Sequence, residues 1–320
     1  MASRWSSGGW PRSGSVAGRI VRLGLYSALV VGLGALLSLG VSRARLAWEP
    51  GSRSTASHVK ISRPPGGSLV ICGGGHTPDT VRDEFVELAG GVEARIVVIP
   101  TARPSADTTD SAPVRDDWTR YDLTSLDLLH ARTRAQADDP AFVEPLTEAT
   151  GVWFCGGFQE RLTDVYLGTA VERGLAAVLA RGGVVGGTSA GAAVMTRVMI
   201  ADGTDSARLA QGFDLLPDAV VDQHFLKRNR MKRLLGTVRT HPDLLGLGID
   251  EQTALVVDVQ ARRVRVIGQS YVVACIPSSS QGTEATPRLE ILKPGDEADL
   301  NALKTRSTHA IVSAAGFDAL

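Results

Sequence analysis

Residues 184–195 (VVGGTSAGAAVM) constrain the fold more than any other stretch, because they predict a buried strand, a sharp turn and a helix start. Ser189 lies at the centre of a G-x-S-x-G pattern that runs from Gly187 to Gly191. A turn that doubles back on itself needs such small residues, and it holds the serine hydroxyl above the edge of a sheet. The alternative is a glycine-rich helix entry capped by an ordinary serine, which the motif alone does not exclude.

Strand and helix patterns alternate through most of the chain. Strands are predicted at residues 68–72, 95–100, 126–130, 152–155 and 184–187, and helices at 79–88 and 169–181. This order predicts an α/β fold with a mostly parallel sheet and helices on both faces. Alternating runs at residues 254–276 predict antiparallel strands toward the C-terminus. In such a sheet, ligand chemistry gathers at the carboxyl ends of the strands, where Ser189 falls.

Composition excludes several classes of protein. The chain has 320 residues, is 43% hydrophobic and has a formal net charge of zero, so no electrostatic argument favours nucleic-acid binding. Cys72, Cys155 and Cys275 lie far apart in apolar runs, which predicts buried free thiols and neither a disulfide framework nor a zinc site. Gly73–Gly75 lacks the G-x-G-x-x-G spacing of a dinucleotide loop. We therefore expect no metal and no cofactor.

The N-terminal part differs from the rest. Its uncharged run LGLYSALVVGLGALLSLGV is long enough for a membrane span. Arg43 lies between the small residues where a signal peptidase would cut, so a signal anchor is favoured over a removed signal peptide. Arginines on both flanks of the run leave its orientation in the membrane open. We expect an exported or membrane-anchored enzyme. The predicted divisions are a basic region at 1–22, the span at 23–41, a linker at 42–66, a catalytic domain at 67–295 and a tail at 296–320.

A nucleophilic serine needs a base to accept its proton and an acid to orient that base. His224 ends a predicted strand downstream of Ser189 and is the candidate base, with His76 in reserve. The acid is either Glu251, at the end of a later strand, or an aspartate such as Asp205, after the helix that Ser189 precedes. The sequence leaves this choice open.

Two further features suit a hydrolase. The turn at Gly156–Gly157 lets the backbone N–H of Gly157 approach a substrate carbonyl, and with the N–H of Ala190 it would form an oxyanion hole. Gln159 lies beside this turn and is expected to hold a polar group of the substrate. The basic run after His224 predicts a preference for substrates with carboxylates, which arginines bind in fork geometry. Its arginines are Arg228, Arg230 and Arg233.

Taken together, residues 187–193, 222–225 and 248–255 resemble the cyanophycinase branch of peptidase family S51, the aspartyl dipeptidase family. Gly73–Gly75 and the turn before Gln159 support the resemblance. It implies a flavodoxin-like, class I glutamine amidotransferase-like fold and a metal-free serine peptidase. Cyanophycinases cut cyanophycin, a polyaspartate with arginine branches, into β-Asp-Arg dipeptides.

The resemblance also implies roles for single residues. Ser189 matches the nucleophile, His224 the base, and Glu251 a family acid, while Asp205 lies near the triad acid of the aspartyl dipeptidases. Phe158 departs from the pattern, because the family has Asn or Asp there. Residues matching the cyanophycinase pocket are Gln159, Asp222, Gln223, Arg228, Arg230 and Arg233.

Rival functions remain open. An α-aspartyl dipeptidase or a peptidase of another acidic polymer would use the same chemistry. A non-catalytic, membrane-tethered binding module on the same scaffold is the second alternative. A glutamine amidotransferase is disfavoured, because that class has cysteine where this chain has Ser189. By analogy with the family, the protein is expected to form a homodimer.

Overall fold

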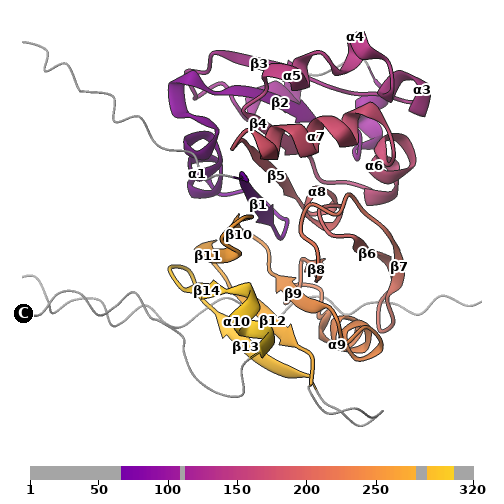
Figure 1. The fold of residues 1–320 in the computed structure, drawn as a ribbon, viewed down its shortest axis with the longest axis vertical. Coiled ribbons are helices and arrows are strands. Elements are labelled where there is room, and N and C mark those ends of the chain that lie inside the picture. The colour runs from indigo at the N-terminus through magenta and orange to yellow at the C-terminus, as the bar shows by residue number, and fades with distance from the viewer. Residues whose placement is uncertain (1–65, 109–111, 279–286, 306–320) are drawn as a thin grey trace, which may run out of the picture. The chain divides into compact units, whose positions relative to one another are not determined.

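The computed structural model describes residues 66–108, 112–278 and 287–305 (Figure 1). The predicted membrane segment at 23–41, the basic region before it and nearly all of the linker lie outside these residues. Among the described residues, no helix combines the length and the apolar character needed to cross a membrane.

The main sheet has eight strands in the order β14-β11-β10-β1-β5-β4-β2-β3. Strands β1, β5, β4, β2 and β3 run parallel, and β10, β11 and β14 extend the sheet with antiparallel pairs. This arrangement confirms the predicted α/β fold with a mostly parallel sheet. The strands are β1 (Ser68–Cys72), β2 (Arg95–Ile99), β3 (Ser125–Leu128), β4 (Gly151–Phe154), β5 (Val184–Thr188), β10 (Thr253–Asp258), β11 (Arg263–Gly268) and β14 (Glu297–Asp299).

Helices cover both faces of this sheet. Alternate residues of each strand point to opposite faces, so both faces present apolar side chains on which helices pack. In β1, Leu69 and Ile71 belong to the apolar cluster under α7, whereas Val70 belongs to the cluster around Phe85 of α1. The longer helices on the sheet are α1 (Asp79–Ala89), α6 (Gln159–Tyr166) and α7 (Ala170–Ala180). The shorter ones are α2 (Ala112–Asp116), α3 (Arg134–Ala137), α4 (Pro140–Val143), α5 (Pro145–Glu148), α8 (Ala190–Ala193) and the 3-10 turns η1 (Gly91–Glu93) and η2 (Pro104–Asp107).

The C-terminal strands do not all join the main sheet. A second sheet has the order β13-β12-β9-β8, in which β8 and β9 are parallel, and α9 packs on it through Leu234 and Val238. The sequence predicted antiparallel edge strands here and did not predict a separate sheet. The elements are β8 (Ala219–Gln223), α9 (Met231–Thr240), β9 (Leu245–Ile249), β12 (Val272–Ile276) and β13 (Arg288–Leu292).

Two smaller parts also differ from expectation. The hairpin of β6 (Val198–Asp202) and β7 (Arg208–Gln211) was not predicted. Past residue 295, β14 pairs with β11, and α10 (Leu300–Thr305) buries Leu300 and Leu303. The packed domain therefore continues through the first part of the predicted tail.

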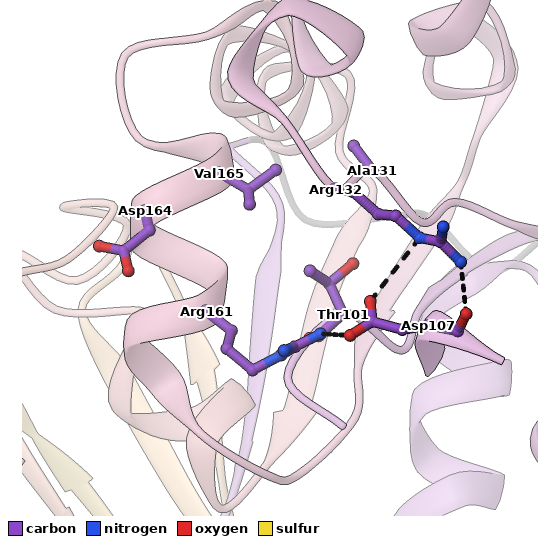
Figure 2. Close-up of a pocket in the computed structure, with 7 residues that line it drawn as sticks. All are labelled: Thr101, Asp107, Ala131, Arg132, Arg161, Asp164 and Val165. Carbon is purple, nitrogen blue, oxygen red and sulfur yellow. Dashed lines mark hydrogen bonds and ion pairs between the residues drawn. The ribbon is translucent and has the colours of Figure 1, made fainter. Parts of the chain in front are cut away.

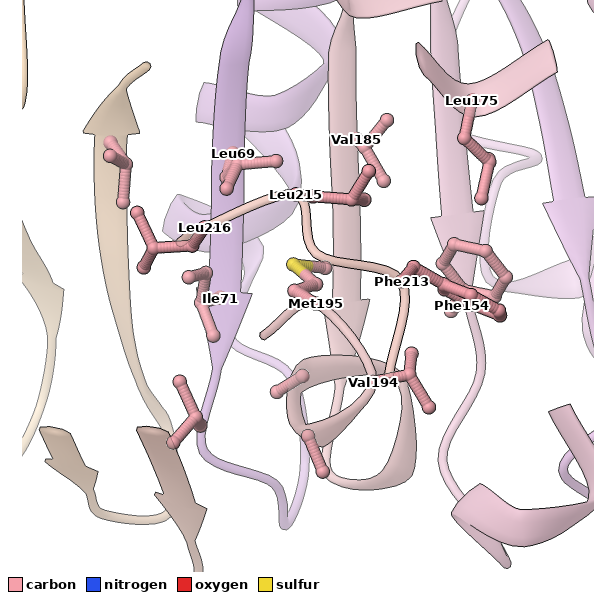
Figure 3. Packing of buried hydrophobic residues seen from close by; sticks show 14 of the residues in the cluster. Leu69, Ile71, Phe154, Leu175, Val185, Val194, Met195, Phe213, Leu215 and Leu216 are labelled. Carbon is pink, nitrogen blue, oxygen red and sulfur yellow. The ribbon is translucent and has the colours of Figure 1, made fainter. Parts of the chain in front are cut away.

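The chain that follows α8 returns across the central strands (Figure 3). Met195, Phe213 and Leu216 are buried in the same cluster as Leu69 and Val185 of the central strands. The backbone N–H of Phe213 donates to the carbonyl of Val194 at 2.7 Å. This packing fixes the short helix α8, and with it the residue that precedes the helix.

Candidate active site

Ser189 forms the turn between β5 and α8, and its backbone is unusual for a residue with a side chain. Its φ is 54° and its ψ is −107°, a conformation that costs free energy and persists only where the surroundings enforce it. The backbone N–H of Ser189 donates to the carbonyl of Cys72 at 3.0 Å. A β-carbon on Gly187 would lie 2.8 Å from the backbone of Gly191, so the turn requires glycine. These features are those of a nucleophile elbow.

His224 follows β8 and reaches the elbow from the second sheet. Its Nε2 lies 2.8 Å from Oγ of Ser189, and its Nδ1 lies 2.6 Å from Oε1 of Glu251. The residue is 7% exposed, and the backbone N–H of His224 donates to the carbonyl of Gly73 at 2.6 Å. Serine, imidazole and carboxylate thus form one continuous chain of hydrogen bonds, the arrangement that activates a serine.

Glu251 is the acid that contacts the imidazole. It follows β9 at the turn into β10, where Gln252 has a φ of 57° and donates its N–H to the carbonyl of Gly74 at 2.9 Å. Asp205 lies instead on the exposed end of the β6–β7 hairpin, 3.6 Å from Nζ of Lys232. Of the two acids that the sequence left open, only Glu251 is in place to orient His224.

Burial sets the charge of the base. It lowers the pKa of His224, and the nearby guanidinium of Arg228 lowers the pKa further, while the hydrogen bond to Glu251 opposes both effects. The imidazole is therefore neutral at pH 7. Because a carboxylate can only accept, we assign the ring proton to Nδ1, which leaves Nε2 free to accept a proton from Ser189.

The two predicted oxyanion donors lie beside the serine. A β-carbon on Gly156 would lie 3.3 Å from Cβ of Ser189, which places the Gly156–Gly157 turn against the elbow. Gly157 has a φ of 148°, and a β-carbon there would lie 2.2 Å from the carbonyl oxygen of Ala102. Within the described ranges, we find no acceptor for the backbone N–H of either Gly157 or Ala190. Both donors are available to a developing oxyanion.

Comparison with known proteins identifies the family. Residues 69–265 match the sequence profile of peptidase family S51. The cyanophycinase of Synechococcus elongatus is 34% identical over 242 residues, which cover 72% of this chain and 73% of that protein. The cyanophycinase of Geminocystis herdmanii is 34% identical over 218 residues, covering 64% and 79% of the two chains. The protein belongs to peptidase family S51. It is a serine peptidase.

A solved structure supports the fold of this S51 peptidase. The crystal structure of a peptidase from an acI-B1 actinobacterium superposes with a TM-score of 0.57 and 24% sequence identity, and it covers 73% of this chain and 96% of that one. At this identity, the likeness concerns the fold alone.

Two of the predicted pocket residues are closed to solvent in the peptidase. Asp222 and Arg233 form a two-pronged ion pair with distances of 2.7 and 2.5 Å, and their side chains are 0% and 3% exposed. Arg233 also donates to the carbonyl of Gly203 in the β6–β7 hairpin at 2.5 Å. We assign this pair a positioning role in place of the direct substrate contact that the resemblance implied.

The remaining pocket residues differ in burial: Gln223 is buried, and Gln159 and Arg230 are half-buried. Arg230 donates to the backbone carbonyl of Gln223 at 2.6 Å and to the side-chain oxygen of the same residue. Arg228 is exposed. Gln159 donates to the carbonyls of Ile200 and Ala201 at 3.1 and 2.6 Å, which ties α6 to β6. Arg228 is thus the arginine most available to a substrate carboxylate.

Three other features that were noted in the sequence lie around the site. Gly74 and Gly75 of the loop after β1 face the ring of His224 and the carboxylate of Glu251. Phe158, the residue before α6, is 63% exposed directly beside Gly157. His76, the reserve base, is exposed on the loop after β1. Among the described residues, no group of three or more His, Cys, Asp and Glu side chains is placed to hold a metal ion.

Proposed function

We propose that this peptidase hydrolyses aspartyl peptide bonds of cyanophycin or a closely similar polymer and releases β-Asp-Arg dipeptides. The observation that carries the proposal is the hydrogen-bonded chain of Ser189, His224 and Glu251. It lies in a chain that is 34% identical to cyanophycinases over 242 residues. The exposed Arg228 beside His224 suits a substrate rich in carboxylates.

Acylation follows from the geometry. Nε2 of His224 accepts the Ser189 proton while Oγ attacks the carbonyl carbon of an aspartyl residue. The negative charge that develops on the carbonyl oxygen is stabilised by the N–H groups of Gly157 and Ala190. Oε1 of Glu251 stabilises the imidazolium through Nδ1. His224 then gives its proton to the leaving amine as the carbon–nitrogen bond breaks, and an acyl-enzyme remains.

Deacylation repeats these steps with water. His224 takes a proton from a water molecule, and the oxygen attacks the ester carbonyl within the same oxyanion hole. Collapse of the intermediate returns the proton to Oγ of Ser189 and releases the carboxylate product. One water is consumed for each backbone amide that is cut.

Product analysis tests the proposal. The full chain is incubated with cyanophycin and, separately, with an α-Asp-Leu dipeptide, and the products are identified by mass spectrometry. We expect β-Asp-Arg from cyanophycin, and a loss of turnover by several orders of magnitude in Ser189→Ala with the fold unchanged. Cleavage of the α-Asp-Leu dipeptide alone would favour an α-aspartyl dipeptidase. Normal turnover by Ser189→Ala would refute the assigned nucleophile.

We also propose that the catalytic domain is exported or tethered to a membrane. The support is the uncharged apolar run at residues 23–41. Fractionation of cells that express the full chain, beside a variant lacking residues 23–41, tests this. The full chain is expected in the membrane or exported fraction and the shortened one in the soluble fraction. Equal distribution of the two would contradict the proposal.

A further inference from the structure

A cavity of about 520 Å³ lies at the carboxyl edge of the main sheet, beyond the ends of β2 and β3 (Figure 2). Its lining combines side chains from these strand ends and from α6: Thr101, Asp107, Ala131, Arg132, Arg161, Asp164 and Val165. None of these residues takes part in the hydrogen-bonded chain of the active site. Figure 2 shows Arg132 and Arg161 directed toward Asp107, whereas the carboxylate of Asp164 points away from all three.

The floor of the cavity is held rigidly. Arg161 donates to a carboxylate oxygen of Asp107 and to the carbonyl of Thr101, both at 2.9 Å. The other oxygen of Asp107 lies 3.2 Å from Nε2 of His130, whose Nδ1 lies 2.9 Å from the Thr101 hydroxyl. That hydroxyl also lies 2.6 Å from the hydroxyl of Tyr166. Asp107 is therefore occupied by its neighbours and does not serve an incoming cation.

Two guanidinium groups and two carboxylates line the cavity. The carboxylate of Asp164 points away from the others (Figure 2), so Arg132 and Arg161 face the carboxylate of Asp107 alone. Burial lowers the pKa of His130, which leaves its ring neutral at pH 7. The side chain of Arg132 is 60% exposed. Its Nη2 donates to the backbone carbonyl of Asp107 and its Nε lies 3.9 Å from Oδ1 of the same residue, so the donors of Nη1 remain for a ligand. Ala131 and Val165 add apolar surface for an aliphatic stem.

The cavity lies at a distance from Ser189 that a substrate of several residues can span. Strand β5, which ends one residue before Ser189, is separated from β2 by β4 alone. At about 4.8 Å per strand, the ends of β2 and β3 lie roughly 10 and 14 Å from the end of β5. An extended chain advances about 3.3 Å per residue, so this span corresponds to about three or four residues.

Adjacent residues separate the cavity from the active site. Thr101 lines the cavity, and the next residue, Ala102, accepts the backbone N–H of Phe158 at 2.9 Å. The carbonyl of Ala102 also closes the space beside Gly157. A polymer that runs from the Gly156–Gly157 turn along the carboxyl edge of the main sheet therefore passes over the cavity.

We propose that this cavity is a second subsite, in which Arg132 binds a carboxylate-bearing branch of the polymer at a distance of about three or four residues from the scissile bond. The inference rests on the proposed function, because it needs a substrate longer than the dipeptide product. In β-Asp-Arg, each arginine branch has a free α-carboxylate next to the methylene groups of its side chain, which fit the cation and the apolar wall.

The test compares substrate lengths in Arg132→Gln. With long cyanophycin, KM should rise about three- to tenfold with kcat unchanged, whereas an oligomer of two β-Asp-Arg units should show no change. Arg173→Gln is the matched control, because Arg173 is an equally exposed arginine on α7 that pairs with Asp138, away from the cavity. Arg132→Lys should recover part of the affinity by keeping the charge.

Binding separates this inference from the proposed function. In a Ser189→Ala background, calorimetric titration should show tighter binding of long polymer than of the two-unit oligomer, and Arg132→Gln should remove that difference. If the wild type cleaves neither substrate, the proposed function fails and the titration still decides the subsite. If Arg132→Gln keeps the length dependence in turnover and in binding, or weakens both lengths equally, the subsite is refuted.

Discussion

Gly74 lies against the imidazole ring of His224. A β-carbon built on Gly74 would lie 2.4 Å from Cε1 and 2.5 Å from Nε2 of the ring, so no other residue fits without moving the base. The loop is fixed from both sides, because Gly73 accepts the backbone N–H of His224 and Gly74 accepts that of Gln252. The glycine loop after β1 is thus a support that sets the position of the imidazole.

The variant Gly74→Ala should lose activity through this contact. Its methyl group would displace the ring of His224, and a displacement of about 1 Å in a catalytic group can cost about 10²-fold in rate. We expect kcat to fall by about that factor, with little change in KM. The measurement is steady-state kinetics on cyanophycin.

Gly295→Ala is the control for backbone strain. Gly295 has a φ of 92°, close to the 108° of Gly74, but a β-carbon there has nothing within 4 Å. Both variants bear the cost of a left-handed conformation, about 1–2 kcal/mol of stability. Only Gly74→Ala should lose activity. Equal activity of the two variants would show that the contact with His224 is unimportant.

Glu251 and Asp205 offer a second comparison. Glu251→Gln should lower kcat by about 10³- to 10⁴-fold, because a neutral amide favours the wrong imidazole tautomer and no longer stabilises the imidazolium. Asp205→Asn should leave kcat unchanged, since its carboxylate is exposed and paired with Lys232. Both variants should unfold at similar urea concentrations. A large loss in Asp205→Asn, with Glu251→Gln active, would reverse the assignment.

The pH dependence should reflect the environment of His224. The base must be neutral to act, so activity rises with pH through its pKa, which burial and Arg228 hold below the ordinary value of 6.5. Arg228→Gln removes a cation that repels the imidazolium, so the substitution raises that pKa. The acid limb of kcat/KM should therefore move to higher pH. Lys232→Gln removes an exposed cation that pairs with Asp205, and it should leave the limb in place.

Local rules account for the parts of the site that the sequence predicted. The elbow at Ser189 follows from glycine and alanine at the positions where the backbone crowds itself, and His224 follows from its place at a strand end. Each depends on a few consecutive residues, so a single sequence suffices. The central parallel strands were predicted for the same reason, because their apolar runs are short and continuous.

The parts of the site that the sequence did not predict depend on contacts between residues far apart in the chain. Glu251 reaches His224 because β8 and β9 lie side by side in a second sheet, and no local pattern distinguishes that pairing from an extension of the main sheet. The contact of Gly74 with His224 joins residues 150 positions apart in the chain. The burial of Arg233 likewise depends on how α9 packs against the hairpin, whereas its place in a basic run predicted a guanidinium open to a substrate carboxylate.

The buried pair of Asp222 and Arg233 gives the last prediction. Asp222→Ala leaves the guanidinium of Arg233 buried without its partner, which should cost about 3–5 kcal/mol in the free energy of unfolding. Replacing both residues, in Asp222→Leu with Arg233→Met, removes the unpaired charge and should cost less than the single change. Urea denaturation measures both values.

Activity should not follow stability in the double variant. Arg233 also donates to the carbonyl of Gly203, and this hydrogen bond fastens the β6–β7 hairpin to α9. The double variant loses that bond even where its stability is restored, so kcat should remain below the wild-type value by about tenfold or more. Because the pair is closed to solvent, KM should change less than kcat. A rise in KM alone, at full stability, would show instead that Asp222 or Arg233 contacts the substrate directly.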